Sequence, residues 1–194
     1  MGDKIILPDD LILENMKLQK VMPETCPDSL RPNRSVTIRN DEKREINGRT
    51  TIMHIMERDP HSDADLRKIY LLKNIAVVGM SKNEEKPGHF VPKYLIEHGY
   101  NVIPVNPKVT EVLGRKSYPS ITDIGEKIEI VDIFRKSEDV PAVIDDVINR
   151  KKNDVKVIWM QEGIYNEEAE KRAKGNSMDV VYNRCMMAEH RRLF

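Results

Sequence analysis

The sequence predicts an α/β protein built on a doubly wound, parallel five-stranded sheet with strand order 3-2-1-4-5. Two observations lead to this prediction. Short apolar runs alternate with helical stretches along residues 63–194, and nearly every position within those runs is apolar. Such strands are typical of parallel sheets that are covered by helices on both faces and joined by right-handed crossovers.

Capping residues and prolines set the expected element boundaries. Ser62 is expected to cap the first helix, and Gly99 to end the second. Pro92 and Pro141 are expected in the first turns of the second and third helices, where a missing N–H breaks no hydrogen bond. The expected strands are 75–79, 101–105, 128–134, 155–160 and 178–182, and the expected helices are 63–72, 89–98, 138–150 and 166–174.

Residues 1–62 are expected to form an N-terminal extension ahead of the domain at 63–194. Four closely spaced prolines, at positions 8, 23, 27 and 32, indicate an irregular loop. Asn47-Gly48 lies between two β-branched stretches and favours a β-hairpin, because both residues tolerate positive φ. Two roles for the extension stay open: it folds over the ligand cleft, or it joins two copies into a homodimer.

The charge balance and the cysteines limit the classes of partner. Lysine plus arginine and aspartate plus glutamate both number 32, which argues against a nucleic-acid binder. No apolar stretch approaches the roughly 20 residues of a membrane span, and the N-terminus lacks a signal-peptide core. Cys26 and Cys185 are far apart, so we expect no disulfide framework and a reducing, cytoplasmic location.

The loop after the first strand has the parts of a phosphate cradle. Gly79 ends the strand and lets a phosphate approach the backbone. Ser81 offers a hydroxyl, Lys82 and Lys86 offer positive charge, and the helix that starts near His89 offers free N–H groups. The same residues also suit simple turn geometry and solubility. Gly79-Met80-Ser81 is not the three-glycine dinucleotide fingerprint, so the loop alone leaves both interpretations open.

The residues after the second strand indicate a phosphorylated ribose. NAD sites usually place Asp or Glu there to hold the ribose 2′-hydroxyl. This chain has Asn106, Pro107 and Lys108 instead, and a lysine attracts a ribose phosphate that a carboxylate would repel. The expected ligand is therefore NADP or coenzyme A with its 3′-phosphate. The alternative is a solvated lysine after a proline turn.

Six sequence blocks then carry a resemblance to a known family. In order they are IAVVGMS, HGYNVIPVNPK, VLGRKSYPSITDI, VDIFRKSEDVP, VIWMQEGIYNEEA and DVVYNRCMMAEH. Over about residues 63–190 the chain resembles the small CoA-binding proteins, which are similar to the N-terminal CoA-binding domain of the succinyl-CoA synthetase α subunit. The resemblance implies a Rossmann-like domain that binds coenzyme A, free or acylated. Members often have Ser where this chain has Gly88, and a helix former where it has Pro92.

The resemblance also implies which residues contact the ligand. The pyrophosphate would lie at the first loop, the adenosine and its 3′-phosphate at the end of the second strand, and the pantetheine arm after the fourth. The end of the third strand would border the adenine and the phosphates. The implied cofactor-binding residues are Gly79, Met80, Ser81, Lys82, Lys86, His89, Asn106, Pro107, Lys108, Phe134, Arg135, Lys136, Ser137, Gln161 and Gly163.

A binding module is expected in preference to an enzyme. Succinyl-CoA synthetase chemistry needs a phosphohistidine domain and a nucleotide-grasp partner, and the residues after the fifth strand leave no room for them. No carboxylate pair, Ser-His-Asp set or metal cluster is evident, and Cys185 with His190 makes an incomplete metal site. We therefore expect a regulatory or carrier role, without catalytic or metal-binding residues. Two alternatives are an NADP-dependent oxidoreductase and a scaffold with a vestigial nucleotide site.

Overall fold

The computed structural model describes residues 59–194, and the hairpin expected around Asn47-Gly48 lies outside this range. All five expected strands and all four expected helices are present, and each end lies within three residues of its expected position. In chain order the elements are α2 (Asp63–Ile69), β1 (Asn74–Val78), α3 (Pro87–Glu97), β2 (Asn101–Val105), β3 (Glu111–Val112), β4 (Arg115–Lys116), η2 (Ile121–Asp123), β5 (Ile130–Ile133), η3 (Ser137–Asp139), α4 (Val140–Ile148), β6 (Val157–Met160), α5 (Glu167–Gly175), β7 (Asp179–Val181) and α6 (Met186–Leu193).

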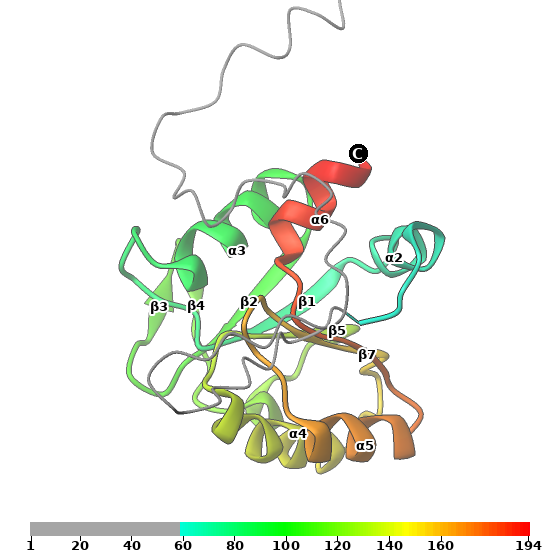
Figure 1. Ribbon diagram of the computed structural model, residues 1–194. Helices are drawn as coiled ribbons and strands as arrows, with labels where there is room; N and C mark the ends of the chain where they lie inside the picture. The colour runs from blue at the N-terminus through cyan, green and yellow to red at the C-terminus, as the bar shows by residue number, and fades with distance from the viewer. Residues whose placement is uncertain (1–58) are drawn as a thin grey trace, which may run out of the picture. The chain divides into compact units, whose positions relative to one another are not determined.

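Five parallel strands form one sheet in the order β2-β1-β5-β6-β7 (Figure 1). β1 lies between β2 and β5, with Val78 opposite Val105 on one side and Ile133 on the other. The pairing continues through β6 and β7, again in parallel. The expected α/β class with a doubly wound, Rossmann-like parallel sheet is therefore confirmed.

The expected strand order 3-2-1-4-5 is wrong. In chain order the strands lie 2-1-3-4-5, because the third strand, β5, pairs with β1 instead of β2. The outer edge of β2 is occupied by Tyr118, whose N–H donates to the carbonyl oxygen of Pro104 at 2.9 Å. Pro104 was a signal for this arrangement, since a proline lacks the ladder N–H and is confined to edge strands.

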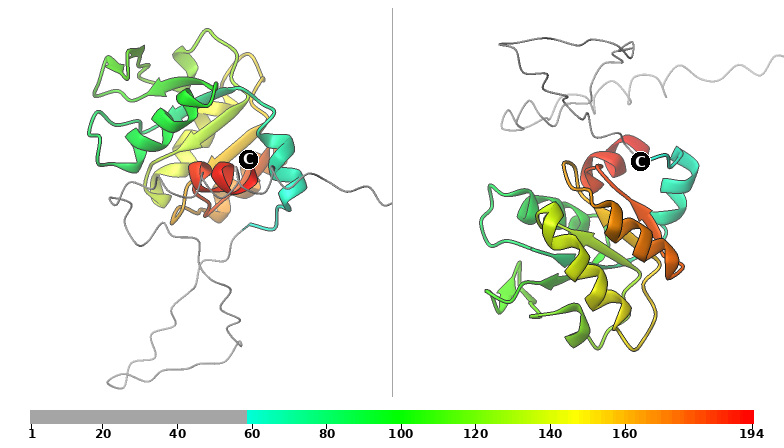
Figure 2. Two further views of the ribbon diagram at one scale, coloured as in Figure 1. Left: turned by 90° about the horizontal axis from the view of Figure 1, so that it is seen from above. Right: turned by 60° about the horizontal axis from the view of Figure 1, so that its bottom comes forward.

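Helices cover both faces of the sheet (Figures 1 and 2). Alternate residues of β1 supply two cores: Ile75 and Val77 pack on the side of α3 and α6, whereas Ala76 and Val78 pack on the side of α4 and α5. α2 lies beside α6, where Arg192 pairs with Asp63 at 2.7 Å. All four β1 positions are buried, as expected for a central parallel strand.

The helix starts follow local hydrogen bonding. Ser62 caps α2 as expected, and its Oγ accepts from the N–H of Asp65 at 3.3 Å. α3 begins at Pro87, so Pro92 lies inside this helix and not in its first turn, contrary to expectation. Pro92 has no N–H for the carbonyl of Gly88, and that carbonyl instead accepts from the N–H of Ser81 at 2.9 Å. The Gly88 carbonyl that Pro92 leaves free therefore joins the helix to the preceding loop.

Two features were not expected from the sequence. The short β3–β4 hairpin follows β2, and the chain after β7 forms the helix α6.

The burial of Arg150 was also not expected. The sequence places this residue in a charged run at the end of α4, but it is only 5% exposed. Within residues 59–194 no helix combines the length and the apolar character that a bilayer crossing requires.

Candidate functional site

The carboxyl ends of β1 and β5 mark the switch point of the sheet. The chain leaves β1 toward β2 on one side, and leaves β5 toward β6 on the other. Ligands of doubly wound sheets bind in the crevice at such a point. Gly79 lies there with φ +90°, and a Cβ added to it would come within 2.4 Å of the carbonyl oxygen of Phe134. The two strand ends therefore approach each other closely only because residue 79 is glycine.

Side chains and backbone fix the loop between Gly79 and α3. His89 is buried and its Nδ1 donates to the carbonyl of Ser81 at 2.8 Å. Asn106, at the end of β2, donates from Nδ2 to the carbonyl of Met80 at 2.8 Å. Ser81 Oγ accepts from the N–H of Asn83 at 3.1 Å. The loop is thus held in one conformation before any ligand arrives, which lowers the entropic cost of binding.

Two of the expected loop residues have structural side chains. Met80 is fully buried in the core beneath α3, so only its backbone faces the loop. The His89 ring is used to hold the loop. Lys82 and Lys86 are exposed, and Lys86 is the N-cap of α3 without a side-chain cap bond. Positive charge and a helix N-terminus therefore meet at the loop, as the sequence predicted.

Pro107 and Lys108 are exposed beyond the end of β2. The Asn106 side chain turns the backbone here, because its Oδ1 accepts from the N–H of Lys108 at 2.9 Å. The Nδ2 of the same amide group donates to the carbonyl of Met80 in the loop after β1. Asn106 thus joins the ends of β1 and β2 and fixes the backbone of Lys108 beyond β2.

A pocket of about 260 Å³ opens beside these strand ends. Gly79, Pro107 and Arg135, three of the expected site residues, line it together although they follow three different strands. Its apolar walls are Val78, Val105, Pro119, Ile121, Ala142 and Val143, and its polar lining is Ser120, Asp139 and Asp146. The pocket thus combines apolar walls with a few polar groups, as small-molecule sites commonly do.

The residues that follow β5 have mixed roles. Phe134 is half-buried against the core, and Arg135 and Lys136 are exposed. Both cations lie near carboxylates, with 3.5 Å from Arg135 to Asp139 and 3.4 Å from Lys136 to Glu138. Such exposed pairs contribute little to stability and leave the cations available to a ligand.

Ser137 directly precedes the helical stretch expected at 138–150, where a serine often acts as N-cap, but it caps no helix here. The cap positions of η3 and α4 are Lys136 and Asp139. The Ser137 hydroxyl instead accepts from the N–H of Tyr165, at 3.2 Å, and its carbonyl accepts from Asn166 at 3.1 Å. Ser137 therefore joins the loop after β5 to the loop after β6.

Of the two expected site residues after β6, Gly163 is exposed and Gln161 is buried. Gly163 is exposed with φ +78°, and its N–H donates to Asn183 Oδ1 at 2.9 Å. Gln161 is buried: its Nε2 donates to Asp132 Oδ1 at 2.6 Å, and its Oε1 accepts from the N–H of Met186 at 3.2 Å. Both ends of the Gln161 amide are therefore engaged inside the protein, where they fix the start of α6.

Asp132 is a fully buried carboxyl group in the middle of the sheet. Its Oδ2 has no hydrogen-bond partner within the described residues. Burial raises the pKa of Asp132 to about 7, although the bond from Gln161 opposes this shift. A raised pKa means that the folded protein retains this proton while the unfolded chain, titrating near 3.8, has already lost it. Stability therefore falls as the pH rises from about 4 to 7.

We expect Asp132→Asn to remove this pH dependence. Between pH 4 and pH 8, the free energy of unfolding of the variant should gain up to about 4 kcal/mol relative to the unmodified protein. Urea denaturation across this range measures the difference, in which the other titrating groups cancel. If the free energies of unfolding of the two proteins changed with pH in parallel, Asp132 would have an ordinary pKa.

Cys185 and His190 do not form a reactive pair. Burial raises the pKa of the Cys185 thiol to about 11, so it is protonated at neutral pH and a poor nucleophile. His190 Nδ1 lies 2.9 Å from the hydroxyl of Tyr94, on the neighbouring helix. No group of three or more His, Cys, Asp or Glu side chains in residues 59–194 is arranged to hold a metal ion.

Residues at η2 and in α4 form one wall of the pocket, and they were not predicted from the sequence. Ser120 and Asp123 form a capping box at η2, and Ser120 Oγ also donates to Asp146 Oδ2 at 3.0 Å. The spacing of a serine and an acid three residues later was a signal for this turn. The contribution of Ala142 and Val143 depends on how α4 packs on the sheet, for which no local signal exists.

The sequence and the fold are similar to those of known proteins. The family model described as a CoA binding domain matches residues 73–191. The uncharacterised protein YneT of Bacillus subtilis is 37% identical over 130 residues, covering 66% of this chain and 94% of that protein. A hypothetical protein from Pyrococcus horikoshii has a similar structure, with a TM-score of 0.66 and 47% identity over 69% of this chain and 93% of its own.

The same domain is similar to part of a larger enzyme. ADP-forming acetate–CoA ligase II of Archaeoglobus fulgidus is 30% identical over 120 residues, which cover 61% of this chain but 17% of the ligase. The family match extends over more than half of the chain and includes every strand of the sheet. This chain is a member of the CoA-binding domain family.

Proposed function

We propose that residues 63–194 bind coenzyme A, free or acylated, at the carboxyl edge of the sheet. Membership of the CoA-binding domain family supports this role. The observation on which the proposal chiefly rests is that Gly79, Pro107 and Arg135 line one pocket, beside a loop that carries two exposed lysines. The adenine would occupy the apolar pocket, and the phosphates would lie between the loop and Lys108.

We further propose a regulatory or carrier role without catalysis. The Archaeoglobus relative is named as a ligase, but the similarity covers 17% of it, so ligand recognition is the only property that we transfer. The buried thiol of Cys185 is protonated at neutral pH, and burial raises the pKa of the Asp132 carboxyl to about 7, but neither group lines the pocket. A binding module that presents CoA to a partner requires no further groups.

Charge reversal at Lys108 tests how the ligand is recognised. We expect Lys108→Glu to weaken the binding of CoA about tenfold, or about 1.4 kcal/mol, because the 3′-phosphate would face a carboxylate. The affinity for 3′-dephospho-CoA should change much less. Isothermal titration of both ligands measures the two affinities.

Lys156→Glu is the matched control. Lys156 is exposed and precedes β6, so it lies at the amino end of the sheet, away from the pocket. The control has the same change in net charge and should bind CoA normally. Equal losses for CoA and 3′-dephospho-CoA in the Lys108 variant would contradict the assignment of this lysine to the 3′-phosphate.

A further inference from the structure

The segment that leads into α2, residues 59–62, is fastened to the edge of the sheet by side chains. We call these four residues the lead segment. Arg184, which follows β7, donates to Asp59 Oδ2 at 2.5 Å and to the carbonyls of Asp59 and His61 at 2.8 and 3.0 Å. His61 reaches Asp179, the first residue of β7. The lead segment therefore contacts both ends of this edge strand.

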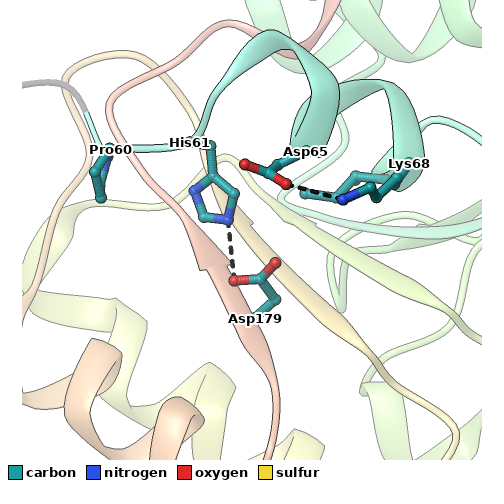
Figure 3. Close-up of a pocket in the computed structure, with 6 residues that line it drawn as sticks. Pro60, His61, Asp65, Lys68 and Asp179 are labelled. Atoms are coloured by element: carbon teal, nitrogen blue, oxygen red, sulfur yellow. Dashed lines mark hydrogen bonds and ion pairs between the residues drawn. The ribbon is translucent and has the colours of Figure 1, made fainter.

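His61 lies between the carboxylates of Asp59 and Asp179, and Figure 3 shows its contact with Asp179. Its Nε2 is 3.0 Å from Asp179 Oδ1, and its Nδ1 contacts Asp59 Oδ1. A neutral imidazole has one N–H, so one of its nitrogens would direct a lone pair at a carboxylate oxygen. Only the imidazolium donates to both carboxylates at once. The geometry therefore fits the charged ring.

The surrounding charges favour the same form. The Asp59 side chain is fully buried and also pairs with Arg184, which in turn lies 3.5 Å from Glu189 of α6. From α2, Asp65 and Lys68 face the same pocket as His61, but they pair with each other at 3.2 Å. The ring thus meets two carboxylates and no unpaired cation within the described residues that line this pocket.

Solvent reaches one side of the ring. The His61 side chain is 13% exposed and that of Asp179 is 50% exposed. Both line a pocket of about 460 Å³ between the lead segment, α2 and β7, together with Pro60 and Ile69 (Figure 3). A proton can therefore leave or return on the Asp179 side, while the Asp59 side stays closed.

We propose that His61 is a charge-dependent clamp, which holds the lead segment against β7 as an imidazolium and releases Asp179 when it loses its proton. The bond to Asp59 raises the pKa of His61 above the ordinary 6.5, burial opposes this, and Asp179 raises it further. The clamp therefore contributes fully below pH 6.5. Its contribution is lost as the pH rises through the higher pKa of the folded state.

Imidazole nitrogen NMR on the full chain tests the charge state. We expect both His61 nitrogens to carry protons at pH 7, with a titration midpoint above 6.5 that falls in Asp179→Asn. His98→Gln removes an exposed histidine at the C-cap of α3, so the signals that it abolishes are assigned to His98, and it should leave the His61 midpoint unchanged. A neutral single tautomer at pH 7, or a midpoint that Asp179→Asn does not lower, would overturn the clamp.

Hydrogen exchange tests the mechanical consequence. We expect His61→Gln to raise amide exchange at least several-fold in peptides covering residues 59–62 and 179–184, relative to His98→Gln at pH 7. The unmodified protein should show the same increase from pH 6.5 to pH 9, after correction for intrinsic rates. If His61→Gln does not fold, the half-exposed Asp179→Asn variant provides the comparison. Exchange equal to that of His98→Gln would reject the proposal.

Discussion

Gly79→Ala should destabilise the fold by about 3 kcal/mol or more and abolish binding of CoA. Two costs add at this position. The alanine would have to adopt φ +90°, a conformation that L side chains rarely adopt, and its Cβ would lie 2.4 Å from the carbonyl oxygen of Phe134. Backbone atoms cannot rotate away as a side chain can. The carboxyl ends of β1 and β5 would therefore have to separate, which alters the pocket at the switch point.

Gly99→Ala separates these two costs. Gly99 ends α3 with φ +80°, but a Cβ added to it would meet no atom within 4 Å. In this control only the unfavourable φ should lower the free energy of unfolding, by about 1–2 kcal/mol, and CoA should bind normally. Urea denaturation gives the two stabilities, and titration at a temperature where both variants are folded gives the affinities. If Gly79→Ala were no more damaging than Gly99→Ala, the close approach of the two strands would not matter.

Arg150→Ala should destabilise the protein by about 3–5 kcal/mol, because it leaves a set of buried acceptors without a donor. The Arg150 side chain pairs with Asp154 at 2.7 Å. It also donates to the carbonyls of Ile121 and Ile124, at 3.1 and 2.6 Å, and contacts that of Glu126. One guanidinium thus holds the whole loop around η2 to the end of α4.

The same substitution should weaken ligand binding, because Ile121 lines the pocket and Arg150 holds its carbonyl. Lys151→Ala is the matched control: Lys151 is the next residue, is exposed, and should change stability by no more than about 0.5 kcal/mol. Chemical denaturation and CoA titration of both variants measure the effects. A loss of stability in Arg150→Ala below about 1 kcal/mol would mean that water replaces the guanidinium easily.

The sequence was sufficient for the positions of the strands and for the glycine at the end of β1. Five apolar runs mark the strands because both faces of a parallel sheet are buried, and Gly79 marks the switch point because only glycine permits the observed approach. The strand order was predicted incorrectly because the expected order ignored Pro104, which suits an edge strand and lies in β2.

The remaining differences come from tertiary contacts. Arg150 lies in a run of charged residues that is typical of a solvated turn, and only the carbonyls of a distant loop make its burial favourable. Gln161 follows a strand at the ligand edge, yet the buried Asp132 and the start of α6 engage both ends of its amide. Neither partner is close to it in the sequence, so no local pattern distinguishes this structural role from contact with a ligand.

The most direct test of the central claim is isothermal titration of the unmodified protein with CoA, acetyl-CoA and NADPH. We expect binding of CoA or its thioester at a single site and much weaker binding of NADPH, because the proposed site is assigned to the 3′-phosphate and pantetheine of CoA. Binding of NADPH without binding of CoA or acetyl-CoA would contradict the proposed function and favour an oxidoreductase. Absence of binding for all three ligands would contradict it in favour of a scaffold.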